Sequence, residues 1–215
     1  MEDVSEVYLT DYIPTIYSSP RTIKYVQDGK NKICNIFAER NGVVIIIYNS
    51  TRNVLVLVKQ FRPSAYIQNV FSETQRMEKE EKVDVNKFPP TLGITLEFCA
   101  GLEDKNIPSE EIAREEILEE FGYNVDVSHL EKIGTIKNLT ESTGANSTFY
   151  YCQVTDDMRL NSGGGVDGEN IEVIEMPVEE VISYSSSREF VSSPINFMYG
   201  LYWFLYNKYN RTGCK

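Results

Sequence analysis

Two apolar runs that follow each other closely constrain the fold of this chain more than any other feature. Residues 43–48 (Val-Val-Ile-Ile-Ile-Tyr) and 54–58 (Val-Leu-Val-Leu-Val) are rich in β-branched side chains, and only the polar stretch 49–53 separates them. Short apolar runs of this composition, bounded by turn-forming residues, are typical of buried strands. The sequence therefore predicts that these two segments form the centre of a sheet.

Further strand and helix signals are spread over most of the chain. Strand patterns lie at 94–98, 148–154 and 171–174, and helix patterns at 109–121, 177–184 and 194–207. In the N-terminal part, the Asp28-Gly29 turn separates two short apolar runs, which is typical of a hairpin. Residues 64–93 are mostly polar and charged, which predicts a solvated surface insertion. We expect one α/β domain over residues 1–215, with a small antiparallel strand segment at about 20–40.

Charge and cysteine usage exclude several classes of protein. The 21 basic and 32 acidic residues give a formal net charge of -11, which repels a polyphosphate backbone, so we expect no nucleic-acid partner. The 4 cysteines are scattered without a C-x-x-C pair, and a single histidine excludes the usual structural zinc sites. No apolar run approaches the roughly 20 residues of a membrane span, and the acidic N-terminus is unlike a signal peptide. We therefore expect a cytoplasmic protein with reduced thiols and no membrane partner.

A short glutamate-rich segment holds the clearest chemical signal. Ser109 suits the N-cap of the helix predicted over 109–121, and Gly122 suits a left-handed exit from it. At about 100° per residue, Glu116, Glu119 and Glu120 share one face of this helix, while its apolar residues gather on another. No lysine lies between these glutamates to relieve their repulsion. The pattern indicates that a group outside the helix neutralises this face.

A divalent cation is one candidate for that neutralising group. Carboxylate oxygens suit Mg²⁺, which shares its remaining positions with waters and with substrate phosphates. The alternative is a solvated acidic helix without a ligand, which by composition is the commoner origin of a glutamate-rich segment. The residues that surround the helix favour the first interpretation.

The segment from Gly101 to Tyr123 resembles the Nudix box, G-x5-E-x7-R-E-U-x-E-E-x-G-U, in which U is a bulky apolar residue. Its last eight positions match the pattern well. Two other positions depart from it, because Ile107 stands where the box has Glu and Glu115 stands where it has Arg. These departures affect the ion pairing within the box, and they leave its metal-binding glutamate positions in place.

The resemblance extends on both sides of the box. Residues 58–63 (Val-Lys-Gln-Phe-Arg-Pro) and 96–102 (Leu-Glu-Phe-Cys-Ala-Gly-Leu) are similar to strands of the Nudix ADP-sugar and UDP-sugar pyrophosphatases. Altogether the similarity covers about residues 20–207. It implies the Nudix α/β/α sandwich, in which a mixed sheet lies between helices and the box forms a loop, a helix and a second loop.

The resemblance also implies a metal site and a catalytic set. Glu116 and Glu120 would be the principal ligands of Mg²⁺, with Mn²⁺ as a substitute. Glu119 would share or support the site, and the backbone carbonyl of Ala100 would complete the protein ligands. Glu169, in an acidic loop before a predicted strand, is expected to be a further ligand or the base. Glu119, Glu120 and Glu169 are therefore the catalytic candidates.

The activity implied by the resemblance is Mg²⁺-dependent hydrolysis of a nucleoside diphosphate sugar by a homodimer. UDP-glucose would give UMP and glucose 1-phosphate, and ADP-ribose would be a second substrate. Arg62 resembles the phosphate-contacting arginine of the family, and its forked donors fit pyrophosphate oxygens, so Arg62 and Glu97 are expected to contact the substrate. The alternative for Arg62 is an exposed ion pair without a substrate role. Two alternatives stay open: an ADP-ribose pyrophosphatase, and a nucleotide-sugar-binding Nudix module that does not cleave, which the departures at Ile107 and Glu115 motivate.

Overall fold

The computed structural model describes residues 4–15, 18–74, 81–165, 170–187 and 191–209. Its main element is a seven-stranded sheet that runs in the order β11-β5-β4-β10-β9, with β7 paired to β5 and β8 paired to β4. These strands are β4 (Gly42–Asn49), β5 (Val54–Phe61), β7 (Ile94–Glu97), β8 (Cys99–Leu102), β9 (Leu130–Lys137), β10 (Asn146–Val154) and β11 (Ile171–Pro177). β10 runs parallel to β4, and the other pairings of this sheet are antiparallel. The two apolar runs are confirmed as neighbouring central strands, β4 and β5.

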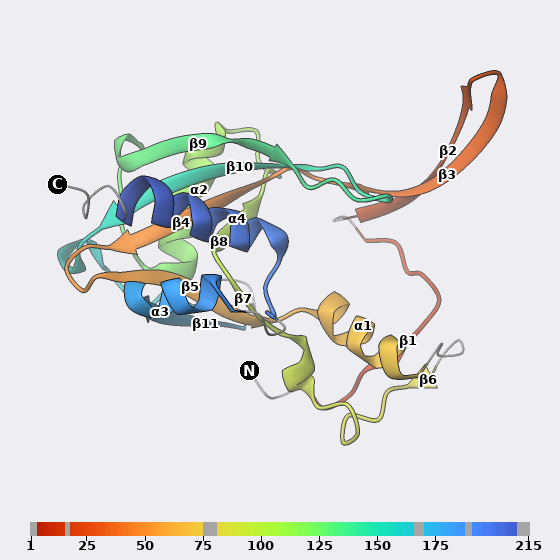
Figure 1. Cartoon of the computed structure of the whole chain (residues 1–215), viewed down its shortest axis with the longest axis horizontal. Helices are drawn as coiled ribbons and strands as arrows, with labels where there is room; N and C mark the ends of the chain where they lie inside the picture. Colours follow the sequence, from red (N-terminus) through yellow and green to blue (C-terminus); the bar gives the residue numbers. More distant parts are fainter. Residues whose placement is uncertain (1–3, 16–17, 75–80, 166–169, 188–190, 210–215) are drawn as a thin grey trace.

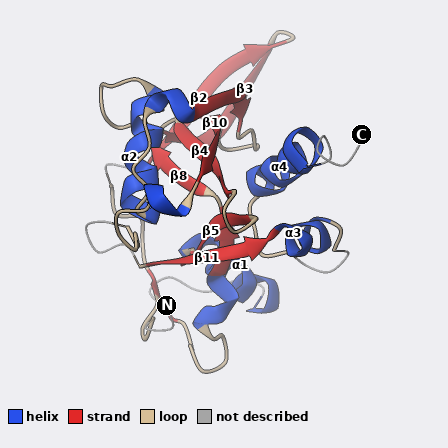
Figure 2. Cartoon of the chain, turned by 90° about the vertical axis from the view of Figure 1, so that its left-hand side faces the viewer, coloured by secondary structure: helices blue, strands red, loops and turns tan. Residues whose placement is uncertain are grey.

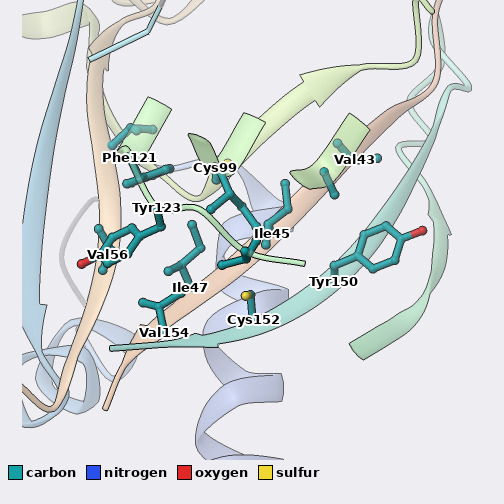
Figure 3. Packing of buried hydrophobic residues seen from close by; sticks show 14 of the residues in the cluster. Val43, Ile45, Ile47, Val56, Cys99, Phe121, Tyr123, Tyr150, Cys152 and Val154 are labelled. Carbon is teal, nitrogen blue, oxygen red and sulfur yellow. The ribbon is translucent and has the colours of Figure 1, made fainter. Parts of the chain in front are cut away.

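Helices cover both faces of this sheet (Figure 1, Figure 2). One face packs against α2 (Ser109–Phe121), and the other packs against α3 (Val178–Ser185) and α4 (Ile195–Phe204). Alternate side chains of β4 enter the two apolar layers, with Val43, Ile45 and Ile47 toward α2 and Val44 and Ile46 toward α3 and α4. Figure 3 shows the layer on the α2 side. The expected α/β/α sandwich with a mixed sheet is therefore confirmed.

The two central strands separate halfway along their length. β4 and β5 pair only through Ile47–Asn49 and residues 54–56. Beyond this point, β8 pairs with residues 42–45 of β4, while β7 pairs with residues 58–61 of β5. β7 and β8 are separated by Phe98 alone, so together they fill the gap between the diverging strands. The divergence brings residues 94–102 to the open end of the sheet.

The glutamate-rich helix α2 has the predicted bounds. The prediction for its C-terminal end is confirmed, and the prediction for its N-cap is wrong. Gly122 ends α2 in the left-handed conformation, with φ of 74°, as predicted. The predicted N-cap is wrong, because Pro108 occupies that position and Ser109 is the first helical residue. The Ser109 hydroxyl instead lies 2.7 Å from the hydroxyl of Tyr150 on β10.

Among the described residues, no helix combines the length and apolar character needed to cross a bilayer.

The N-terminal strand segment is a long hairpin made of β2 (Ser18–Gln27) and β3 (Lys30–Glu39). Its turn is the predicted one, with Asp28 at φ 52° and Gly29 at φ 71°. The hairpin projects away from the sheet (Figure 1) and carries exposed apolar side chains, which are Ile23, Tyr25, Val26, Ile33 and Phe37. The hairpin prediction is confirmed, and the strands extend further than the sequence indicated.

The described residues of the segment 64–93, which are 64–74 and 81–93, form more regular structure than the predicted solvated loop, and residues 75–80 lie outside the described part. It contains most of α1 (Pro63–Thr74), the short strand β6 (Glu81–Lys82) and the 3₁₀ turn η1 (Pro90–Gly93). β6 pairs with β1 (Tyr8–Leu9), which connects the insertion to the N-terminal segment. The segment also has a small apolar cluster of its own, formed by Tyr66, Val70, Val83 and Phe88. The solvated-loop prediction is wrong because these few apolar residues, which are separated by polar residues in the sequence, pack together in the folded chain.

Candidate active site

A pocket of about 780 Å³ opens where β4 and β5 diverge. Its lining comes from the end of β3, the start of β4, Arg62 after β5, the start of α1 (Pro63–Thr74), β7 and β8, the β9–β10 connection, and the residues just before and at the start of α4. Three of the residues selected from the sequence, Arg62, Glu97 and Ala100, are among the lining residues. The volume lies within the range of about 300–1,000 Å³ that is usual for small-molecule sites. The pocket is therefore large enough for a nucleotide-sized ligand.

Arg62 and Glu97 form a forked ion pair at this pocket. Nε of Arg62 donates to Oε1 of Glu97 at 2.8 Å, and Nη2 donates to Oε2 at 2.7 Å. Thr95 precedes Glu97 by two residues on β7, so both side chains lie on one face, and its hydroxyl donates to Oε1 at 2.7 Å. Glu97 is only 7% exposed, whereas 44% of the Arg62 side chain is exposed. The buried carboxylate therefore orients a guanidinium group that faces the pocket.

Glu116 meets β8 at a glycine. A Cβ built on Gly101 would lie 2.0 Å from Oε1 of Glu116, so no larger residue fits at position 101 without moving this carboxylate. Gly101 follows Ala100 directly, and both residues pair with the open end of β4. The arrangement places a carboxylate oxygen of α2 against Gly101, the residue after Ala100, whose carbonyl the family resemblance implies as a ligand.

Glu120 approaches the same strand two residues earlier, at Cys99. Glu120 is 5% exposed, and its negative charge acts on the thiol of Cys99, which is completely buried. The pKa of Cys99 is raised well above its usual value, first by burial and then by the negative charges of Glu120 and Glu116. Both carboxylates therefore face β8 in the region of Cys99 and Gly101.

These oxygen donors fit the chemistry of a hard divalent cation. Mg²⁺ takes a small number of protein carboxylates and keeps waters or substrate oxygens in its other positions. Within the described residues, no group of three or more acidic, histidine or cysteine side chains is arranged as a complete metal site. Glu169 lies outside the described residues. Glu116, Glu120 and the Ala100 carbonyl are thus two side chains and one backbone oxygen, a set that leaves room for substrate.

The backbone of Glu119 takes part in the hydrogen bonding at the C-terminal end of α2. Its carbonyl oxygen accepts a hydrogen bond from the backbone N–H of Gly165 at 3.2 Å. The side chain is neither fully buried nor fully exposed. Glu119 lies beside Glu120 in the last turn of α2 and remains a candidate for supporting the metal site.

The two departures from the box pattern have a structural counterpart. The box places a glutamate in the loop and an arginine on the helix, whereas this chain has Ile107 and Glu115 at those positions. In the structure, Nζ of Lys105 in the loop lies 2.5 Å from Oε2 of Glu115 on the helix. The loop and the helix are therefore joined by an ion pair whose charges are reversed relative to the pattern. Arg114, next to Glu115, pairs with Glu111 at 2.9 Å.

Several residues of the site were not selected from the sequence. Thr95 could have been found, because it alternates with Glu97 along a predicted strand. Arg40 lines the pocket from the connection between β3 and β4, and Lys105 reaches Glu115 across ten positions of the chain. Neither of these placements follows from a local pattern. They depend on how the strands and the loop are brought together.

Known proteins similar to this chain include several pyrophosphatases, although no family model matches the sequence. The chain is 32% identical to the uridine diphosphate glucose pyrophosphatase NUDT14 of Bos taurus over 212 residues, which cover 95% of each protein. It is 32% identical to the GDP-mannose pyrophosphatase of Pectobacterium atrosepticum over 167 residues, which cover 74% of this chain and 75% of the relative. A crystal structure of an ADP compounds hydrolase superposes with a TM-score of 0.61 over 95% of this chain and 96% of the other. At 13% identity, that last likeness shows the fold alone.

Proposed function

Since this chain belongs to the Nudix hydrolase family and is a pyrophosphatase of its nucleoside diphosphate sugar group, we propose that it hydrolyses UDP-glucose to UMP and glucose 1-phosphate with Mg²⁺. The observation that supports this proposal most strongly is that the carboxylates of Glu116 and Glu120 both face β8, the first at Gly101 and the second near the Cys99 thiol. The pocket, which Ala100 and Gly101 line but the glutamates of α2 do not, carries the oriented guanidinium of Arg62. Carboxylates for a cation and an arginine for an anion are what a pyrophosphate requires.

Glu116, Glu120 and the carbonyl of Ala100 would hold the cation, with Glu119 in support and Glu169 as a further ligand. When bound, Mg²⁺ supplies charge neutralisation for the pyrophosphate and for the charge that develops on its oxygens. Mn²⁺ would substitute for it, because it prefers the same oxygen donors. This proposal rests on the donor set at β8 and on the family pattern.

The side chains of the pocket bind and orient the substrate in this proposal. Arg62, held by Glu97 and Thr95, presents its exposed guanidinium to a pyrophosphate oxygen. A carboxylate from the set Glu119, Glu120 and Glu169 accepts the proton of the attacking water. The bond that breaks is a phosphoric anhydride bond, and its two products each keep one phosphate.

The preferred nucleotide sugar follows from the relatives rather than from the pocket. The relatives from Bos taurus and Mus musculus, each 32% identical, carry the name of a uridine diphosphate glucose pyrophosphatase. Their similarity covers 95% and 87% of this chain, against 74% for the GDP-mannose pyrophosphatase described above. UDP-glucose is therefore the proposed preferred substrate, and ADP-ribose and GDP-mannose are the alternative substrates to compare with it.

The hairpin of β2 and β3 is the proposed site of homodimer formation. Its apolar side chains Val26 and Ile33 are 67% and 68% exposed. Apolar side chains that project from a hairpin in this way are costly in water and favour a contact with a second copy. The single-domain organisation and the cytoplasmic location stay predictions.

The variant Glu120→Gln tests the proposed site. It keeps the size of a side chain that is 5% exposed, and it removes the negative charge that a cation would need. We expect loss of Mg²⁺-dependent cleavage with an unchanged circular dichroism spectrum. Glu179→Gln, on the exposed part of α3, is the matched control and should retain activity. Cleavage by Glu120→Gln at the wild-type rate would contradict the site.

A further inference from the structure

A glycine-containing loop closes onto the end of the glutamate-rich helix. The backbone N–H of Leu160 donates to the carbonyl of Gly122 at 2.7 Å, and the N–H of Gly164 donates to the carbonyl of Glu120 at 2.8 Å. The N–H of Gly165 donates to the carbonyl of Glu119 at 3.2 Å. The last carbonyls of a helix have no partner within the helix, so an external donor is needed wherever water is excluded. Residues 160–165, which we name the capping loop, supply those donors to α2.

The capping loop approaches the helix more closely than side chains permit. A Cβ built on Gly163, at φ 67°, would lie 2.1 Å from the carbonyl oxygen of Glu120. In the other direction, a Cβ built on Gly122, at φ 74°, would lie 2.2 Å from the carbonyl oxygen of Asn161. The two backbones are therefore in direct contact through a glycine on each side.

The side chain of Asn161 fixes the conformation of the capping loop. Its Oδ1 accepts the backbone N–H of Gly163 at 2.8 Å. The guanidinium group of Arg159 donates from Nε to the carbonyl of Asn161 at 3.1 Å and from Nη2 to the carbonyl of Ser162 at 3.3 Å. The loop thus has its own internal hydrogen bonds, so its contact with α2 is made by a preformed surface.

The opposite side of the helix end is held by the core. Tyr123 is completely buried, and its hydroxyl receives hydrogen bonds from Nδ2 of Asn49 at 3.0 Å and Nη2 of Arg52 at 3.1 Å. Phe121 is also completely buried in the layer that Figure 3 shows. The last turn of α2 is therefore held in place on one side by core packing and on the other by hydrogen bonds from the capping loop.

We propose that Gly163 is a positioning residue for the carboxylates of Glu119 and Glu120, through the contact of the capping loop with their backbone. The inference rests on the proposed function, because it concerns the metal and catalytic roles of those two glutamates. A shift of the Glu120 backbone moves a carboxylate that must meet β8 beside Cys99 and Ala100. Catalytic geometry is sensitive to displacements of about 1 Å, and supporting groups around a metal site are worth about 10–100-fold in affinity or activity.

Gly163→Ala tests this inference, with Gly29→Ala as its matched control. Gly29 has almost the same backbone conformation, φ 71°, but a Cβ built there would have nothing within 4 Å. Both variants therefore carry the strain of a left-handed alanine, and only Gly163→Ala also forces the capping loop away from Glu120. Mn²⁺ binding to the substrate-free protein, followed by electron paramagnetic resonance, is the first measurement. The second is the split of kcat and KM for UDP-glucose with Mg²⁺.

We expect Gly163→Ala to bind Mn²⁺ about 10-fold or more weakly and to lose about 10–100-fold in kcat with little change in KM. Gly29→Ala should stay within about twofold of wild type in both measurements, since its added Cβ touches nothing. Equal Mn²⁺ affinity and equal kcat in the two variants would overturn the inference. Wild-type protein without metal-dependent cleavage would instead refute the proposed function, so the two failures are distinguishable.

Asn161→Ala provides a milder test in case Gly163→Ala does not fold. It removes the acceptor of the Gly163 N–H and leaves both glycines in place. We expect a weakening of Mn²⁺ binding in the same direction, by about 3–10-fold, because one hydrogen bond of the loop is lost. Wild-type Mn²⁺ affinity in folded Asn161→Ala would overturn the inference.

Discussion

Oε1 of Glu116 occupies the space that a side chain on Gly101 would need, at 2.0 Å from the position of its Cβ. The glycine at this position of β8 is therefore required by the glutamate on α2, since the φ of Gly101 is not left-handed. The contact sets how closely the helix approaches the strand whose Ala100 carbonyl completes the proposed metal site.

Gly101→Ala should displace the Glu116 carboxylate and reduce metal-dependent turnover by about 10–100-fold, because the added methyl group leaves no room for it. Gly144→Ala is the matched control, since a Cβ there would have nothing within 4 Å. Steady-state kinetics at saturating substrate, with the Mg²⁺ concentration varied, would measure the effect. Wild-type Mg²⁺ dependence in Gly101→Ala would contradict the placement of Glu116.

Thr95→Val should weaken substrate binding while leaving kcat largely unchanged. The substitution removes the hydroxyl that donates to Glu97 at 2.7 Å, so the carboxylate that orients Arg62 loses one of its donors. A hydrogen bond to a charged group contributes about 1.5–3 kcal/mol. If the whole of this energy is lost from substrate binding, the affinity for UDP-glucose should fall to about a tenth of the wild-type value or less. The KM for UDP-glucose would measure it.

Thr135→Val controls for the loss of a threonine hydroxyl elsewhere in the sheet. Its hydroxyl lies 3.1 Å from that of Thr148, across β9 and β10, and it does not line the pocket. We expect a KM close to that of wild type for this variant. An equal rise in KM for both variants would mean that Thr95 acts only on the general stability of the sheet.

Lys105 and Glu115 should be interchangeable in sign. Lys105→Glu alone places two negative charges where the ion pair now joins the loop to the helix, and we expect a severalfold loss of activity. The double exchange Lys105→Glu with Glu115→Lys should restore most of it. Because the two side chains are 53% and 31% exposed, their coupling is about 0.2–1 kcal/mol. A double-mutant cycle on kcat/KM would measure the coupling, and additive losses would exclude it.

The fold was predictable where the local pattern and the three-dimensional packing agree. The runs of β4 and β5 are apolar throughout because they are buried on both faces, and α2 carries both its apolar face and its glycine exit in sequence. β9 was not predicted, because its burial is partial and a register shift interrupts its pairing with β10. The prediction for the insertion 64–93 was wrong for a related reason, because its apolar cluster is formed by residues that lie far apart in the sequence.

The site was predictable as a set of residue types but not as a set of contacts. The glutamates of α2 were selected from their spacing and from the family resemblance. The pairing of Arg62 with Glu97 joins residues 35 positions apart, and the tie of Lys105 to Glu115 replaces an expected pair by one of opposite polarity. Contacts of this kind depend on strand register and loop path, which a single sequence does not specify.

The cysteines should differ sharply in reactivity. Burial raises the pKa of Cys152 to about 12, so its thiol stays protonated and enclosed at neutral pH, whereas Cys34 lies partly exposed on the hairpin. Iodoacetamide at pH 8, followed by peptide mass spectrometry, should modify Cys34 in the native protein and Cys152 only after unfolding. Rapid modification of Cys152 in the folded protein would contradict the packing around β10.

Cys152 also predicts a direction for stability at alkaline pH. Its pKa in the folded protein lies above the unfolded value of about 8.5. Its contribution to the free energy of unfolding is therefore complete below about pH 8.5 and is lost as the pH rises toward 12. Urea unfolding at pH 7.5 and pH 10 should show a smaller difference for Cys152→Ala than for wild type. An equal pH dependence in the two proteins would exclude this contribution.

The most direct test of the central claim is product analysis of the purified protein with UDP-glucose, ADP-ribose and GDP-mannose, each with Mg²⁺ and with EDTA. We expect UDP-glucose to be cleaved fastest, to UMP and glucose 1-phosphate in equal amounts, and EDTA to stop the reaction. Faster cleavage of ADP-ribose would contradict the substrate assignment while keeping the site. Absence of metal-dependent cleavage of all three substrates would contradict the account itself.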